Sequence, residues 1–315
     1  MKDYESFFED ALVPELRRLE VRRRRRLRAM AVLAVAAFAA AAVLVFHETL
    51  AAVTALGEDL VILGALLVAV GATAVIFQLK SRTRREIKTA LVAPTCRFLG
   101  LDYSATAHDF PLAHFTAAGL LPDHDSARLE DHIRGTHEQV SFQLCEGLLK
   151  KRVQRTDGKG HTRSEQQVVF QGLLLFYRFP KPFGGRTLVL PDRGWLGNKL
   201  AGLRYGERVR LEDPRFEELY EVFSDDQVEA RYLLTTGFLE RLTALADQLG
   251  AGRALSFGFL DQDLLIVFKS GRAHFEGGSL FAPLDRPERA RALLEELRLI
   301  HQLIEQLDLA NRSWL

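Results

Sequence analysis

Two long apolar segments stand near the start of the chain. Residues 29–46 are 18 positions without a charged side chain, and residues 60–79 are 20 positions in which Gln78 is the strongly polar member. At a helical rise of about 1.5 Å per residue, such segments cross most or all of a hydrocarbon layer about 30 Å thick. Neither has the polar stripe that a helix in a soluble protein normally keeps toward water. The pattern predicts a transmembrane hairpin over residues 29–79.

Basic side chains flank the hairpin on its two outer sides, whereas residues 47–59 between the spans contain three acidic residues and no Lys or Arg. Because basic residues near span ends are retained in the cytoplasm, we expect both termini there, including an amphipathic, Arg-rich segment over residues 1–28. We also expect the flanks to contact the lipid bilayer through its anionic headgroups. The flanking residues are Arg17, Arg18, Arg22, Arg23, Arg24, Arg25, Arg26 and Arg28, and then Lys80, Arg82, Arg84, Arg85 and Lys88.

Glycines recur every seven residues in the second apolar segment and just before it, at Gly57, Gly64 and Gly71. A seven-residue repeat returns to nearly the same helix face. Small residues allow close helix approach in lipid, so we expect these glycines to pack on the alanine run 39–42. The alternative is that the same seam forms a homo-oligomer.

Beyond the hairpin, apolar residues keep a helical spacing up to Pro94, which predicts a juxtamembrane helix over residues 80–101. The pattern then changes to period two and to short runs rich in Val, Leu, Phe and Tyr, without crossover helices between them. Residues 102–315 are therefore expected to form a cytosolic α+β domain on an antiparallel sheet, with a pleckstrin-like barrel as a special case. The expected strands are 137–147, 168–185, 187–192, 208–213, 219–225, 254–260 and 263–269.

Two longer helices are expected to pack on this sheet. Residues 236–249 repeat apolar side chains at spacings of four, three and four, and Gly250 is placed to end the helix. The last helix is expected over residues 286–309, with an apolar face formed by Leu293, Leu297, Ile300, Ile304 and Leu307.

Acidic residues precede two of the expected helices with the spacing of a capping box. These pairs are Asp226 with Glu229 and Asp285 with Glu288. Acidic groups at a helix start accept hydrogen bonds from free backbone N–H groups, so we interpret both pairs as caps. A cation site formed by Asp225, Asp226 and Glu229 is the alternative.

A polar, Gly-containing stretch over residues 150–167 is expected to be an exposed connection between strands. We interpret it as a solvated hairpin tip, and contact with anionic lipid is the alternative. Its basic residues are Lys150, Lys151, Arg152, Arg155, Lys159 and Arg163.

The nearly balanced charge, 42 Lys plus Arg against 41 Asp plus Glu, is unevenly distributed: residues 1–88 carry 14 basic and 10 acidic residues. The remaining residues are net acidic and show no recognisable nucleic-acid-binding module, so no nucleic-acid partner is expected. The two cysteines, Cys96 and Cys145, lie too far apart for a CxxC site. They are expected to be buried thiols.

One cluster contains residue types that bind zinc, namely His124, Asp125, Asp131, His132 and His137. Their spacing matches no known metal framework, so a solvated loop is the preferred interpretation and a metal site the alternative. Phosphate-binding, dinucleotide and nucleophile-elbow motifs are absent from the sequence. No cofactor is therefore expected.

Three segments occur together behind the hairpin: EDHIRGTHEQVSFQLCE, VVFQGLLLFYRFPKPFGGRTLVLPD and FEELYEVFSDDQVEARYLLT. With them the chain resembles the bacterial membrane-protein family catalogued as domain of unknown function 3137, over roughly residues 102–309. The resemblance implies a multi-pass protein of the bacterial inner membrane with a cytosolic domain. It brings no activity, cofactor or catalytic residue, and it suggests a LemA-like membrane protein as a partner.

These observations favour a non-enzymatic interaction or regulatory module that holds another protein or lipid near the inner leaflet. A membrane-tethered enzyme with an unrecognised site is the alternative, with the histidine cluster or the group Asp225, Asp226, Glu229 and Arg231 as its candidates. A small oligomeric pore is a second alternative. It is disfavoured because neither apolar segment contains Asp, Glu, Lys, Arg or His.

Overall fold

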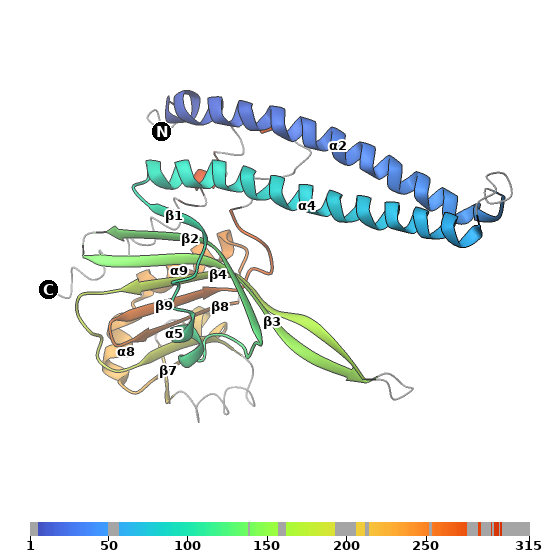
Figure 1. Ribbon diagram of the computed structural model, residues 1–315. Coiled ribbons are helices and arrows are strands. Elements are labelled where there is room, and N and C mark those ends of the chain that lie inside the picture. The colour runs from blue at the N-terminus through green and yellow to red at the C-terminus, as the bar shows by residue number, and fades with distance from the viewer. Residues whose placement is uncertain are drawn as a thin grey trace. The chain divides into compact units, whose positions relative to one another are not determined.

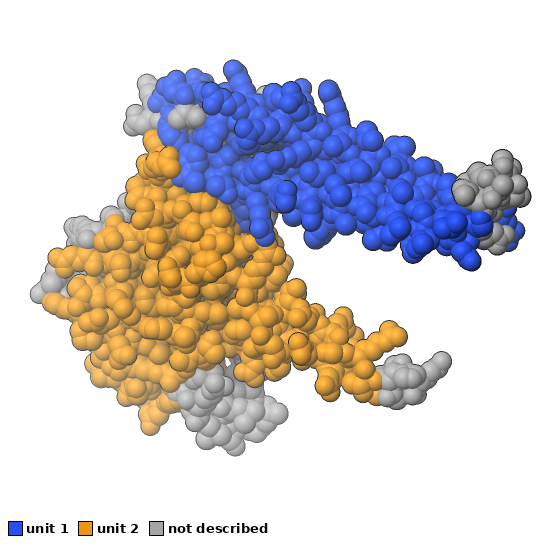
Figure 2. Space-filling view, viewed as in Figure 1, with its two compact units in different colours: residues 1–94, 277–293 blue, residues 95–276, 294–315 orange. Residues whose placement is uncertain are grey.

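The computed structural model divides the chain into two compact units, residues 1–94 with 277–293 and residues 95–276 with 294–315 (Figure 2). The residues that it describes are 6–49, 57–137, 139–156, 162–192, 206–211, 214–251 and 254–275, together with 283, 284, 291, 293–295 and 297.

Two long helices dominate the first unit (Figure 1). After a short π-helical turn, η1 (Phe8–Leu12), they are α2 (Val13–Val45) and α4 (Glu58–Phe98). Both extend beyond the apolar segments into the charged flanks, because the basic residues there are good helix formers. The expected juxtamembrane helix is thus the continuation of α4.

The regular apolar spacing ends at Pro94, yet α4 continues through this residue to Phe98. Proline removes one backbone hydrogen bond and crowds the preceding turn. The side chains around it are deeply buried, with Leu91 1% and Val92 and Cys96 0% exposed. Packing of this turn therefore outweighs the lost hydrogen bond.

The second unit is built on one nine-stranded sheet in the order β1-β2-β3-β4-β9-β8-β5-β7-β6, with every printed pairing antiparallel. The α+β prediction is confirmed. The described sheet has β1 and β6 as its edges, so it is open where a pleckstrin-like barrel would close. The strands are β1 (Asp102–Thr106), β2 (Ser126–His137), β3 (Val140–Thr156), β4 (Thr162–Arg178), β5 (Thr187–Pro191), β6 (Glu207–Val209), β7 (Tyr220–Ser224), β8 (Leu255–Leu260) and β9 (Asp263–Phe268). The helices are α5 (Leu112–Ala117), α7 (Pro214–Glu217), α8 (Gln227–Leu233) and α9 (Thr236–Gln248).

The centre of the sheet is buried on both faces. Phe170, Leu174 and Phe176 of β4 belong to a buried apolar cluster with the α5 segment. On the opposite face, Phe238 of α9 packs against Phe257 of β8, with ring centroids 5.8 Å apart. Burial on two faces explains why β4 is a continuous apolar run rather than an alternating one.

The expected helix over residues 236–249 is confirmed as α9, and Gly250 ends it with a φ of 72°. Only parts of the last helix lie among the described residues. Leu293 and Leu297 are helical and buried there, 6% and 2% exposed, as the apolar repeat predicts. Ile300, Ile304 and Leu307 lie outside the described residues.

Two polar segments that were expected to be loops are strands. The region around the histidine cluster forms most of β2, and the connection over residues 150–167 consists largely of the paired ends of β3 and β4, with residues 157–161 outside the described residues. Residues 126–128 and 162–168 are exposed on both faces. They therefore lack the alternation by which a half-buried strand is recognised.

Candidate functional site

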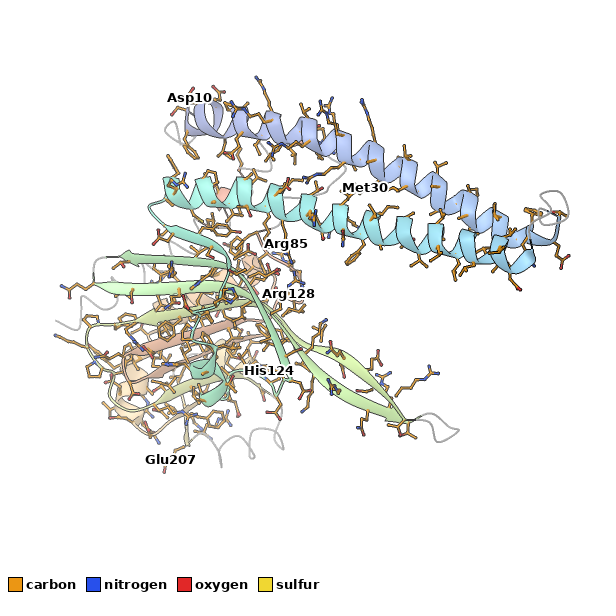
Figure 3. All side chains as sticks on the ribbon, viewed as in Figure 1. Asp10, Met30, Arg85, His124, Arg128 and Glu207 are labelled. Atoms are coloured by element: carbon orange, nitrogen blue, oxygen red, sulfur yellow. The ribbon has the colours of Figure 1, made fainter. Side chains whose placement is uncertain are left out.

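The apolar parts of α2 and α4 expose their side chains instead of burying them. In each helix, 11% of the most apolar 18-residue window is buried inside the protein. Phe38 and Phe77, for example, are 77% and 72% exposed, and side chains project outward along both helices (Figure 3). The core helix of a soluble protein would be mostly buried, so this surface is suited to lipid. By length and composition both helices are able to cross a membrane.

The predicted glycines have no close neighbour, and other small residues of the two helices are buried. A Cβ added at Gly57, Gly64 or Gly71 would meet nothing within 4 Å, so the prediction that these glycines pack on the first span is wrong. The buried small residues are Ala65 and Ala72 of α4, with Ala40 of α2. Ala65 and Ala72 repeat at the same seven-residue spacing as the glycines, and spacing alone does not choose between two stripes one residue apart. Packing in a homo-oligomer stays a prediction.

One arginine predicted for the membrane surface is buried. Arg23 is 5% exposed and donates through Nε and a terminal nitrogen to the Glu20 carboxylate, at 2.8 and 2.7 Å. Arg24 donates to the same carboxylate at 2.7 Å, and the backbone N–H of Leu284 donates to it at 3.1 Å. Arg23 therefore joins a buried ion pair that ties the distant residue 284 to α2.

Another of these arginines links the two helices. Arg26 donates to Thr83 Oγ1 at 3.1 Å and to Glu86 Oε1 at 2.9 Å. Most of the other flanking basic residues have exposed side chains, as a headgroup contact requires: Arg17, Arg18, Arg22, Arg24, Arg25, Arg28, Lys80, Arg82, Arg84 and Arg85. The side chain of Lys88 is half-buried.

The predicted histidine cluster is divided among separate interactions. His124 Nδ1 lies 3.0 Å from the carbonyl oxygen of Pro122, and Asp125 accepts a hydrogen bond from the backbone N–H of Arg152 at 2.6 Å. The side chain of His137 lies outside the described residues. Within the part of the chain that the structure describes, no group of three or more His, Cys, Asp or Glu is placed to hold a metal ion.

A β-bulge accompanies the burial of the two middle residues of this cluster, Asp131 and His132. The register of β2 against β3 shifts between Glu130 and Ile133, and Asp131 has a φ of 54°. Asp131 accepts a hydrogen bond from the Tyr103 hydroxyl at 2.8 Å, and His132 Nε2 lies 2.9 Å from the side-chain oxygen of Gln143. Burial lowers the pKa of His132, which favours the neutral ring. The interpretation as a solvated loop is wrong for these two residues.

Asp226 caps α8 as predicted, because its Oδ1 accepts from the backbone N–H of Val228 and of Glu229 at 2.9 and 3.0 Å. The other half of the capping box is different. Glu229 accepts from the backbone N–H of Gly184 at 3.1 Å, and the Asp226 N–H donates to Ser224 Oγ at 3.1 Å. Glu229 thus holds the loop before β5 instead of the helix start. Asp285 and Glu288 lie outside the described residues.

The neighbouring charged residues Asp225 and Arg231 also form hydrogen bonds within the protein. Asp225 accepts a hydrogen bond from the backbone N–H of Arg186, and Arg231 donates to the Gln227 side-chain oxygen at 3.2 Å. The three residues first considered for a cation site therefore all accept hydrogen bonds from backbone N–H groups, and Asp226 is the one that does so at a helix start.

Sequence reasoning missed a cluster around Asp263, which is 6% exposed. Arg178 donates to its two oxygens at 2.8 and 3.1 Å, and His114 Nδ1 lies 3.0 Å from Oδ2. The hydrogen bonds to Asp263 raise the pKa of Arg178. These residues are 85 and 149 positions from Asp263, so no local spacing signals the cluster. It joins α5 to the ends of β4 and β9.

The basic connection forms a β-ribbon, residues 150–156 of β3 and 162–168 of β4, which extends away from the rest of the sheet (Figure 1). A register shift between Leu149 and Lys150 marks the point where it leaves the sheet. Bulges of this kind bend a strand pair and increase its twist. At the base of the ribbon, the Asp125 carboxylate accepts a hydrogen bond from the backbone N–H of Arg152, and Asp123 Oδ2 lies 3.6 Å from Lys151 Nζ.

One part of the chain matches a known family model. Residues 168–309 match the model described as "Protein of unknown function (DUF3137)", the family that the sequence resembles. None of the curated proteins matches the chain. The solved structure of the mycobacterial trehalose monomycolate transport factor A, TtfA, matches with a TM-score of 0.32 and 7% identity, over 70% of this chain and 95% of that one. A TM-score this low says nothing about the function of this chain.

Proposed function

We propose that this chain, whose residues 168–309 match the DUF3137 model, is a membrane-anchored interaction module. The observation that carries the proposal is the exposure of the apolar windows of α2 and α4, of which 11% is buried. So much apolar surface is unfavourable in water and favourable in a bilayer. The basic flanks and the acidic intervening residues support an inner-membrane hairpin with both termini in the cytoplasm.

An interaction role is favoured over catalysis by what the candidate catalytic groups do in the structure. Asp226 and Glu229 hold backbone N–H groups, and His132 is buried against Gln143. Groups engaged in this way stabilise the fold and are not aimed at a common point where a substrate would react. The module would hold a second protein, a LemA-like membrane protein among the candidates, beside the membrane.

The orientation predicts one labelling pattern. A Thr54→Cys variant should react with an impermeant thiol reagent in intact cells, because the residues between the spans are expected outside. The native Cys96 and Cys145 are each 0% exposed, and burial raises the pKa of Cys145, so neither should react. A Gln154→Cys variant, exposed on the ribbon, should react after lysis alone. Reaction of the Gln154→Cys variant, and not of the Thr54→Cys variant, in intact cells would reverse the topology.

The module itself is tested by purifying the full chain at native expression in mild detergent and identifying bound molecules by mass spectrometry. We expect a stoichiometric protein partner that residues 1–98, expressed as an anchor control, do not retain. A monodisperse chain without a protein partner that carries a tightly bound metal or small molecule would contradict the module and favour the enzyme. Conductance in single-channel recordings of the reconstituted chain would favour the pore.

A further inference from the structure

The outer ribbon has no partner strand other than itself among the described residues. β4 pairs with β9 along Leu173–Arg178, and β2 pairs with β3 as far as Lys150. Beyond these points the two strands pair with each other, and all but Val153 of residues 151–156 and 162–168 are exposed. An isolated two-stranded hairpin is marginally stable at best in water. The ribbon therefore adds little to the stability of the sheet. Its length suggests a role other than stabilising the fold.

Two arginines face each other across the outer part of this ribbon. Arg155 and Arg163 are directly paired in register, so both side chains project from the same face. Like charges in this arrangement destabilise a hairpin. Glu165 compensates weakly, because its Oε2 lies 3.9 Å from Arg155 Nε and the two side chains are 65% and 74% exposed. An external anion would relieve this repulsion.

The ribbon is strongly basic on an otherwise acidic part of the chain. Its described residues include five basic side chains and one acidic side chain, Glu165, whereas residues 89–315 as a whole contain 28 basic and 31 acidic residues. Such a local concentration of positive charge attracts anions to the ribbon. The ribbon has no Phe, Tyr or Trp on which a base could stack. A flat anionic surface fits these features better.

The connection between the second apolar segment and the sheet is short. After the apolar segment, α4 continues from Lys80 to Phe98, about 28 Å of helix, and β1 begins at Asp102. The ribbon itself is about 20 Å long at the rise of a strand. A short tether gives a high effective concentration, so a few basic side chains are enough to bind the anionic inner leaflet.

We infer that the outer ribbon binds the phosphate-bearing headgroups of anionic phospholipids, with Arg155 and Arg163 as the principal contacts. The inference rests on the membrane anchoring proposed above. Binding of the ribbon would orient the sheet domain on the membrane and so present one side of it to a partner.

The test uses the full chain in lipid nanodiscs, with a fluorophore on a Thr156→Cys variant and a nitroxide quencher on a small fraction of the headgroups. Discs of phosphatidylcholine alone are compared with discs that also contain phosphatidylglycerol. We expect quenching to rise about twofold in the anionic discs and to fall again in high salt, as a surface potential requires. The double variant Arg155→Gln, Arg163→Gln should return it to the neutral level. The matched control Arg231→Gln, Arg241→Gln removes two exposed charges from α8 and α9 and should keep the full increase.

Equal quenching in the two kinds of disc, or an equal loss in both double variants, would overturn the inference. A response of the fluorophore to glycerol phosphate in neutral discs would assign the site to a free phosphate compound instead, and a stronger response to added DNA would assign it to nucleic acid. Incorporation into discs is scored separately by size-exclusion chromatography. Failure there would contradict the anchoring, and with it the ribbon contact, whereas normal incorporation without lipid-dependent quenching would contradict the ribbon contact alone.

Discussion

Replacing Gly172 by alanine is expected to unfold the sheet domain or to lower its stability by about 3 kcal/mol or more. A Cβ at this position would fall on the carbonyl oxygen of Phe268 and lie 3.0 Å from the backbone nitrogen of Ser270. Backbone atoms of a paired strand have no rotamer by which to give way. The substitution would therefore separate β4 from β9 at the centre of the sheet.

Gly147 is the matched control, because it is paired with Gly172 in register on β3. Its added Cβ would meet side chains instead, Leu174 Cδ1 at 3.2 Å and Phe170 Cε1 at 3.3 Å. These side chains are able to shift, so we expect Gly147→Ala to cost about 1–2 kcal/mol. Calorimetry of the detergent-purified chain measures both variants. Equal unfolding temperatures for Gly172→Ala and the native chain would show that the close approach of β4 and β9 is wrong.

Replacing Leu297 by aspartate should also prevent stable folding, at a cost of about 3–5 kcal/mol. Leu297 is 2% exposed and lies on the apolar face of the last helix, so the variant would bury a charge in place of an apolar side chain. Leu297→Met, which nearly conserves volume, should cost less than about 1.5 kcal/mol. Resistance to limited proteolysis as a function of temperature measures the difference. Native resistance in the aspartate variant would contradict the burial of this face.

The same apolar repeat predicts that Ile300→Asp is equally damaging, although Ile300 lies outside the described residues. Leu293 and Leu297 follow the predicted phase. A helical repeat sets the phase of every later member, so Ile300 should share their face. Damage from Ile300→Asp equal to that from Leu297→Asp would extend the face by one turn.

The sequence alone determined the helices and strands that do not depend on one particular distant segment of the chain. Two uncharged segments specify helices for a lipid environment because any lipid satisfies their surface. The apolar repeat of α9, and the cap at Asp226, depend on residues within a few positions of one another. Strands β4, β5, β7, β8 and β9 are apolar enough to be recognised without knowledge of their neighbours.

Only the tertiary structure decided the features that join distant residues. Asp263 meets Arg178 and His114 across 85 and 149 positions, and Glu20 receives the N–H of a residue 264 positions away. The bulge at Asp131 and the extension of the basic ribbon likewise depend on which strands pair and where pairing ends. Local periodicity records which side of one element avoids water, whereas these contacts depend on which surfaces meet when the chain is folded.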